Sequence, residues 1–208
     1  MVKNNFNMKK LSLLLCVILF MTVSCHKPKL VGEFYLTAKT KELNPFSGYE
    51  KLTFKDDTGP DEILEGDARI NNIIKAYIGD ESGDFVLWEQ DYSRFVNDQY
   101  EINITLSTYL EEPYLSIHFK DFVDGYTIYS GFKIRDDSII GRYYDSILIH
   151  QVWYHHIYYD TMKYQTHPFP ADIQRFPVKS YYSATSGVVK IDFSDDSFLE
   201  LDKIEWTE

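Results

Sequence analysis

Residues 99–107, QYEINITLS, and residues 113–119, PYLSIHF, decide the fold class, because apolar and polar side chains alternate along both stretches. Alternation with a period of two places the apolar side chains on one face of a β-strand. The link TYLEEP, whose last residue Pro113 opens the second stretch, is short enough to join neighbouring antiparallel strands. We therefore predict a β-hairpin with one buried face, formed by the apolar residues Tyr100, Ile102, Ile104, Leu106, Leu115, Ile117 and Phe119.

Similar strand signals recur on both sides of this hairpin. The chain of 208 residues contains 17 Tyr and 14 Phe, and its periodic segments are filled by Tyr, Phe, Ile, Val and Thr, which favour strands. Around ten short strands with few helix signals predict a mostly β protein, a single antiparallel β-sandwich or barrel-like domain. The further strands are predicted at 30–37, 49–55, 84–90, 126–134, 138–149, 151–160, 187–193 and 198–206.

Two stretches are harder to interpret. Within 61–78, DEILEGDARINNIIKAYI, apolar residues recur at helical spacing, which favours one short helix; Gly66 disfavours a helix by ~1 kcal/mol relative to alanine. Two short strands are the competing interpretation. The stretch 165–180, QTHPFPADIQRFPVKS, contains three prolines and is predicted to be a loop, because proline cannot donate a hydrogen bond within a sheet.

The first 25 residues have the pattern of a targeting segment. Three lysines precede a mostly apolar run of 13 residues at 11–23, which is shorter than the ~20 residues of a membrane-spanning helix and fits a secretory signal. The end of this run, Thr22-Val23-Ser24-Cys25, resembles the lipobox of bacterial lipoproteins. The resemblance implies that the Cys25 thiol carries a diacylglycerol and that Cys25 becomes the new N-terminus. An ordinary secretory peptide with an incidental cysteine is the alternative.

This interpretation divides the chain into a lipoprotein signal peptide at 1–24, a short tether at 25–29 and one β-rich domain at 30–208. The tether sequence His26-Lys27-Pro28-Lys29 is basic. Because surface-bound lipoproteins of some double-membraned bacteria carry acidic residues after the cysteine, the resemblance implies an outer-membrane protein that faces the periplasm. The expected partner is thus a membrane, contacted through the lipid anchor.

Cysteine content and charge exclude several classes of function. The other cysteine, Cys16, lies inside the signal, so the mature chain has no disulfide partner for Cys25 and no zinc–thiolate site or cysteine nucleophile in its folded domain. The mature chain has 18 basic and 32 acidic residues, a net charge of about −14. Because phosphate backbones repel such a surface, we expect no nucleic-acid binding.

An aromatic-rich segment at 143–164 contains the candidate ligand-binding residues Trp153, Tyr154, Tyr158 and Tyr159. Exposed Tyr and Trp rings can grip a glycan or an envelope protein, whereas cross-strand aromatic pairing is the structural alternative. Strand alternation would place His150 and His156 on one face and His155 on the other. Because these histidines lack His-x-His spacing, we predict no metal site, although His155 or His156 could meet His167.

Catalytic patterns are weak. Paired aspartates at 56–57, 136–137 and 195–196 suit turns. Ser183 and Ser186, in the stretch YYSATSG, lack the strand–elbow–helix context of a serine nucleophile. We therefore predict no catalytic residues and no cofactor, and lean away from an enzyme.

Two further resemblances concern the ends of the domain. LVGEFYLT, at 30–37, looks like the Gly-x-Trp opening strand of lipocalin-like barrels, with Phe34 in place of the tryptophan, and Lys203 matches the family's basic residue on the last strand. This resemblance implies an apolar ligand cavity. The ending YYSATSGVVKIDFSDDSFLEL is similar to the closing hairpins of small β-rich lipoproteins of unknown function.

These observations lead us to expect a lipid-anchored envelope protein that acts as a non-enzymatic binding or structural module. The first alternative is a lipocalin-like carrier of a small apolar ligand. An envelope hydrolase ranks lowest.

Overall fold

The computed structural model describes residues 28–78, 83–108, 112–164 and 173–207. Strands dominate the described part, which contains one short helix, α2 (Ala38–Lys41). The strands are β1 (Leu30–Phe34), β2 (Lys51–Asp56), β3 (Glu62–Tyr77), β4 (Phe85–Val96), β5 (Tyr100–Ser107), β6 (Tyr114–Asp121), β7 (Tyr126–Arg135), β8 (Ser138–Ile140), β9 (Arg142–Ile149), β10 (Val152–Thr161), β11 (Lys163–Tyr164), β12 (Pro177–Ser183), β13 (Gly187–Phe193) and β14 (Phe198–Glu205).

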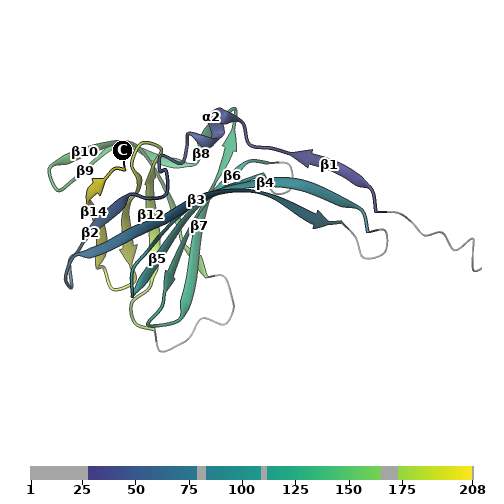
Figure 1. Ribbon diagram of the computed structural model, residues 1–208. Helices are drawn as coiled ribbons and strands as arrows, with labels where there is room; N and C mark the ends of the chain where they lie inside the picture. Colours follow the sequence, from purple (N-terminus) through teal and green to yellow (C-terminus); the bar gives the residue numbers. More distant parts are fainter. Residues whose placement is uncertain (1–27, 79–82, 109–111, 165–172, 208) are drawn as a thin grey trace, which may run out of the picture.

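All these strands belong to one sheet, in the order β11-β7-β6-β5-β4-β3-β2-β14-β13-β12-β10-β9, with β1 added to β4 and β8 added to β7. Every pairing is antiparallel except that of β1 with β4. Only Met162 separates β10 from β11, so this continuous segment pairs with β12 at one end of the path and with β7 at the other. The predicted mostly antiparallel β fold is therefore confirmed, and the sheet curls back on itself (Figure 1).

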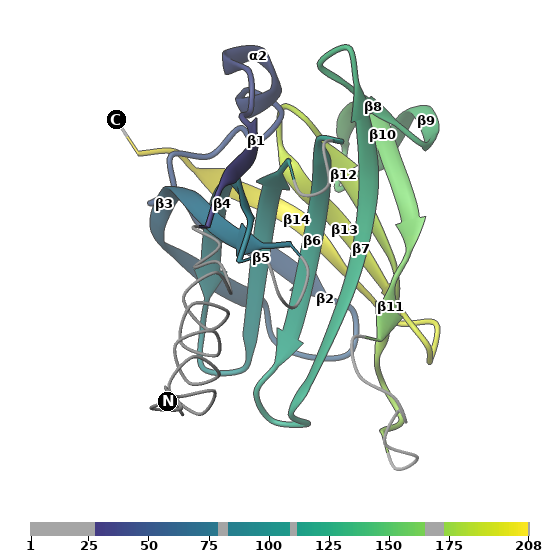
Figure 2. The ribbon, with the colours of Figure 1, turned by 90° about the vertical axis from the view of Figure 1, so that its right-hand side faces the viewer.

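The curled sheet has two layers, with β5, β6 and β7 in one and β2, β12, β13 and β14 in the other (Figure 2). Rings from opposite layers meet in the core. Phe119 packs edge-on against Phe193 with centroids 6.0 Å apart, and Phe132 lies 6.5 Å from Tyr182. The Ser130 and Ser180 hydroxyls, both buried, lie 2.5 Å apart across the same interior. The seven apolar residues of the predicted central hairpin are all buried here, as its alternation predicted.

The predicted short helix at 61–78 is wrong, and so is the alternative of two short strands. A single strand, β3, runs from Glu62 to Tyr77 and pairs first with β2 and then with β4. A bulge between Gly66 and Ala68 marks the change of partner. Gly66 fits there because a Cβ atom would lie 2.6 Å from the Gly48 carbonyl oxygen. The outer half of β3 leaves the two-layer body, so neither face is consistently buried and its apolar residues show no clean period of two.

The proline-rich stretch is only partly described. Its residues 165–172, which include His167, lie outside the described residues. The predicted loop is wrong for residues 177–180, because β12 begins at Pro177 and lies between β10 and β13. A proline is tolerated as the first residue of a strand, where its missing N–H costs little.

Buried polar side chains fasten the N-terminal segment to the sheet. The carboxylate of Glu89, on β4, accepts hydrogen bonds from the Leu36 backbone N–H at 2.7 Å and from Asn71 Nδ2 at 2.6 Å. Lys41 Nζ lies 2.5 Å from the same carboxylate. These contacts hold helix α2 and its flanks over one end of the sheet, where they help to form the site described next.

Candidate binding pocket

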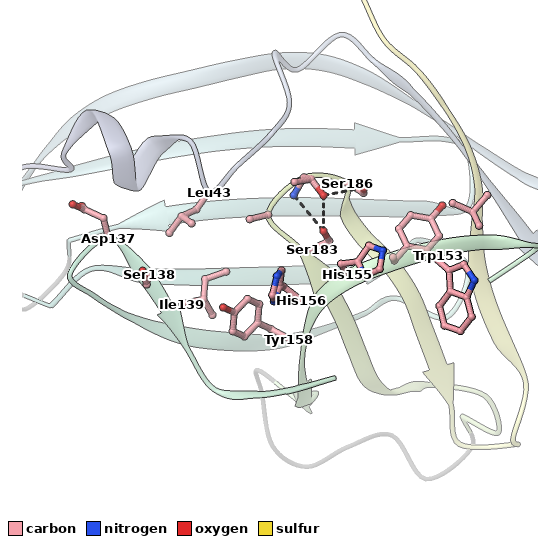
Figure 3. Close-up of a pocket in the computed structure, with 14 residues that line it drawn as sticks. Leu43, Asp137, Ser138, Ile139, Trp153, His155, His156, Tyr158, Ser183 and Ser186 are labelled. Carbon is pink, nitrogen blue, oxygen red and sulfur yellow. Dashed lines mark hydrogen bonds between the residues drawn. The ribbon is translucent and has the colours of Figure 1, made fainter. Parts of the chain in front are cut away.

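A pocket of about 480 Å³ lies where four segments meet at one end of the curled sheet (Figure 3). Strand β10 supplies one wall, the β7–β8 turn and the start of β8 a second, and the β12–β13 turn a third, while Leu43 comes from the fourth segment, after α2. A volume of this size suits a small ligand. The described lining residues are Leu43, Asp137, Ser138, Ile139, Val152, Trp153, Tyr154, His155, His156, Tyr158, Ser183, Ala184, Thr185 and Ser186.

Three of the four predicted aromatic residues line this pocket. Trp153 is 59% exposed, the most open of the three. Tyr154 is half-buried, and burial raises the pKa of its phenol. The Tyr158 ring lies 6.4 Å from the core ring of Phe132, which fixes its position. Together they give the pocket one exposed aromatic residue and two that are partly buried against the core.

The fourth predicted residue, Tyr159, belongs to a separate cluster. Its ring stacks on that of Tyr144 with centroids 4.7 Å apart, and the Tyr181 ring lies 6.2 Å away. Lys179 Nζ sits 4.2 Å from the centroid of Tyr159, within cation–π range. These cross-strand contacts match the structural alternative considered for the aromatic segment.

The two adjacent histidines both line the pocket, contrary to the predicted alternation. The reason is local: His156 has a φ of +51°, in the left-handed region, so regular alternation is interrupted there. His150 lies instead in the β9–β10 turn, with Nε2 3.5 Å from Glu200 Oε2 on β14. His155 and His156 thus place two imidazoles beside the aromatic wall.

Hydroxyl groups form the wall on the β12–β13 turn. Ser183 Oγ lies 2.9 Å from Thr185 Oγ1 and accepts a hydrogen bond from the Thr185 backbone N–H at 3.3 Å. Ser186 Oγ lies 3.5 Å from Thr185 Oγ1. The sequence had pointed to Ser183 and Ser186 only as weak candidate nucleophiles. The structure instead shows three clustered hydroxyls that can donate and accept hydrogen bonds.

The carboxylate in the pocket wall, Asp137, already has partners. It accepts hydrogen bonds from the Thr37 hydroxyl and, at 2.6 Å, from Thr40 Oγ1, both at the start of α2. These hydrogen bonds lower the pKa of Asp137. Asp136 and Asp137 form a two-residue turn with φ of +51° and +56°, which confirms the predicted turn at this aspartate pair. Asp137 thereby links α2 to the β7–β8 hairpin.

The arrangement does not make a hydrolytic triad. A triad needs a hydrogen-bonded chain from a carboxylate through an imidazole to a hydroxyl. Here Ser183 is hydrogen-bonded to Thr185, and Asp137 is hydrogen-bonded to Thr37 and Thr40, so these groups do not form such a chain. Within the described residues, no group of three or more His, Cys, Asp or Glu side chains is placed to hold a metal ion. Fourteen described lining residues include neither lysine nor arginine. The described lining therefore offers no lysine or arginine to an anionic group and combines apolar faces with polar groups.

Comparisons with protein-family models, curated proteins and solved structures found no match to this chain. In the described ranges, no helix has the length and apolar character needed to cross a membrane. The predicted lipidation residue, Cys25, lies outside the described residues.

Proposed function

We propose that this protein is a lipid-anchored envelope protein that binds a neutral saccharide in the pocket beside Trp153. The observation that carries the proposal is that aromatic residues of β10, clustered hydroxyls and two histidines line one concavity. Sugar rings have apolar faces that stack on aromatic side chains, and their hydroxyl groups exchange hydrogen bonds with Ser, Thr and His.

The two alternative functions receive less support. A lipocalin-like carrier requires an apolar cavity inside the sheet, whereas the inward-facing residues of the central strands pack against one another as a core. An envelope hydrolase requires a nucleophile connected to a base, whereas Ser183 is hydrogen-bonded to Thr185. The site is open at the surface and polar on one wall, which favours reversible binding.

The anchored part of the proposal rests on the lipobox-like residues Thr22–Cys25 and the apolar run before them. An anchor at this point would leave the folded domain only a few residues from the membrane. A neutral saccharide ligand is compatible with the acidic surface of the mature chain, because binding then involves no charge repulsion.

A panel of neutral and charged oligosaccharides tests the proposal on the full mature chain. We expect at least one neutral saccharide to bind, and Trp153→Ala to weaken that binding by ten-fold or more. Trp206→Ala is the matched control, because Trp206 is 51% exposed and does not line the pocket. Equal affinities of the wild type and Trp153→Ala for every ligand would overturn the assignment of the site.

A further inference from the structure

An arm of three strands extends beyond the two-layer body (Figure 1). It is formed by β1, the outer half of β3 and the first half of β4. Tyr77 at the end of β3 pairs with Phe85 at the start of β4, and β1 runs parallel to β4, with Phe34 beside Trp88. Among the residues that the structure describes, none forms a second layer over this arm, so both its faces are partly open.

Exposed apolar side chains gather on this arm. Tyr77 is 64% exposed and Ile78 is 48% exposed, and both lie at its outer end. Lys75 Nζ sits 3.9 Å from the centroid of the Phe85 ring. Exposed apolar side chains gathered on one element are a feature of interaction sites. Aromatic residues next to lysine are typical of the boundary between lipid and water, where the ring is embedded and the ammonium group reaches the headgroups. The exposed large apolar residues of the arm are Leu30, Val31, Tyr35, Ile73, Tyr77 and Ile78.

The start of the described chain lies at the same end of the arm. The Lys29 backbone N–H donates to Asp84 Oδ1 at 3.1 Å, and the Phe85 N–H donates to the Lys29 carbonyl at 3.0 Å. Pro28 is therefore held beside the outer end. Cys25 precedes Pro28 by three residues, a span of at most about 11 Å between Cα atoms. A lipid on Cys25 would place this apolar end at the bilayer surface.

The charges of this end are mixed. Lys29 and Lys75 lie at or near it, and so does Asp84, whose carboxylate accepts a hydrogen bond from the Lys29 N–H. The mature chain as a whole carries a net charge of about −14, and an acidic body is repelled from anionic headgroups. This repulsion favours an orientation that keeps the body away from the membrane.

We propose that the outer end of the arm, defined by Leu30, Val31, Tyr77, Ile78 and Phe85, rests in the headgroup region of the bilayer beside the lipid anchor. This inference rests on the anchoring included in the proposed function. Because β9 and β10 lie on the side of the body opposite the arm (Figure 1), the contact would direct β10, which lines the pocket, away from the membrane.

Single-cysteine labelling tests the contact directly. The thiol of an acylated Cys25 is blocked and the mature chain has no other cysteine, so one introduced cysteine can be labelled selectively. We would place a fluorophore at Ile78→Cys and, as a matched control, at Tyr49→Cys. Tyr49 is exposed and lies in the loop before β2, on the body. The acylated full mature chain is reconstituted in vesicles of phosphatidylethanolamine and phosphatidylglycerol, with brominated lipids as quenchers.

We expect brominated lipids to quench the label at position 78 at least three-fold more than the label at position 49. Circular dichroism and intact mass establish that each variant is folded and acylated. Equal quenching at the two positions in acylated protein would overturn the membrane contact and leave the anchor in place. Protection of position 78 that depends on protein concentration would also overturn it, because a second copy would then cover the arm. A chain without fatty acid would instead refute the anchor itself.

Discussion

Arg69 on β3 and Asp91 on β4 form a two-point ion pair, with Nε 2.9 Å from Oδ1 and Nη2 2.7 Å from Oδ2. The Asp91 side chain is 3% exposed. The remaining Arg69 donors reach backbone carbonyls at the end of α2 and in the segment after it, at Lys41, Asn44 and Phe46. One guanidinium thus ties the N-terminal segment to the long β3–β4 hairpin.

Removing Arg69 should therefore destabilise the whole domain. Arg69→Ala leaves the Asp91 carboxylate buried without its partner, and breaking such a pair costs about 3–5 kcal/mol. Lys133→Ala is the control, because both members of the Lys133–Glu112 pair are 66% exposed and an exposed pair contributes at most ~1 kcal/mol. Urea unfolding of the three proteins measures both values. A loss below 1 kcal/mol for Arg69→Ala would contradict the structural role of this pair.

The acid sensitivity of the fold should depend partly on Glu89. Burial alone would raise the pKa of Glu89, but hydrogen bonds from Lys41, Asn71 and the Leu36 N–H outweigh burial and lower it. A lowered pKa in the folded state contributes stability that is present above the unfolded-state pKa of about 4.3 and is lost as pH falls through the folded value.

Between pH 6 and pH 3, the wild type should therefore lose more stability than Glu89→Gln, which cannot titrate at this position. Glu42→Gln, which changes an exposed carboxylate at the end of α2, should follow the wild type. Unfolding midpoints measured at several pH values test this difference. Parallel curves for the wild type and Glu89→Gln would refute it.

Alanine substitutions at two glycines allow the cost of backbone strain to be measured apart from the cost of a steric clash. Gly48 has a φ of +98°, and a Cβ atom there would lie 2.0 Å from the Arg69 backbone nitrogen. Gly125 has a φ of +71° but open space around its Cα atom. We expect Gly125→Ala to cost about 1–2 kcal/mol through backbone strain alone. Gly48→Ala should cost clearly more, because backbone atoms would have to move. Equal thermal unfolding midpoints for the two variants would argue against the close approach at Gly48.

The left-handed backbone at His156 also makes a specific prediction. A β-branched side chain is strained at a φ of +51°, whereas glycine is not. His156→Val should therefore be less stable than His156→Gly by about 1–2 kcal/mol, although valine favours strands elsewhere. Chemical unfolding of both variants gives the comparison. The opposite order would show that this backbone conformation does not persist in solution.

Sequence patterns predicted the parts of the fold that have one buried face. The alternation from Tyr100 to Phe119 correctly predicted β5 and β6, since their inward side chains reach a common core. Strand β3 was missed because its outer half lies in an uncovered arm, where burial imposes no period. The start of β12 was predicted as part of a proline-rich loop. Pro177 is nevertheless compatible with a strand here, because it is the first residue of β12.

The candidate pocket was predictable only in part. The aromatic density at 153–158 was visible in the sequence, and three of its aromatic residues do line one concavity. Their meeting with Ser183 and Asp137 depends on the curling of the sheet, which brings together turns far apart in the chain. The shared orientation of His155 and His156 depends on one positive φ angle that no residue pattern encodes.

The chemical state of Cys25 is the most direct test of the central claim that this domain is held at a membrane by a lipid. The measurement is the intact mass of the protein extracted from its own membranes, followed by fragmentation of the N-terminal peptide. The account predicts a chain that begins at Cys25 and carries a diacylglycerol on its sulfur. A chain that retains residues 1–24, or one that begins near Cys25 without any fatty acid, would contradict it.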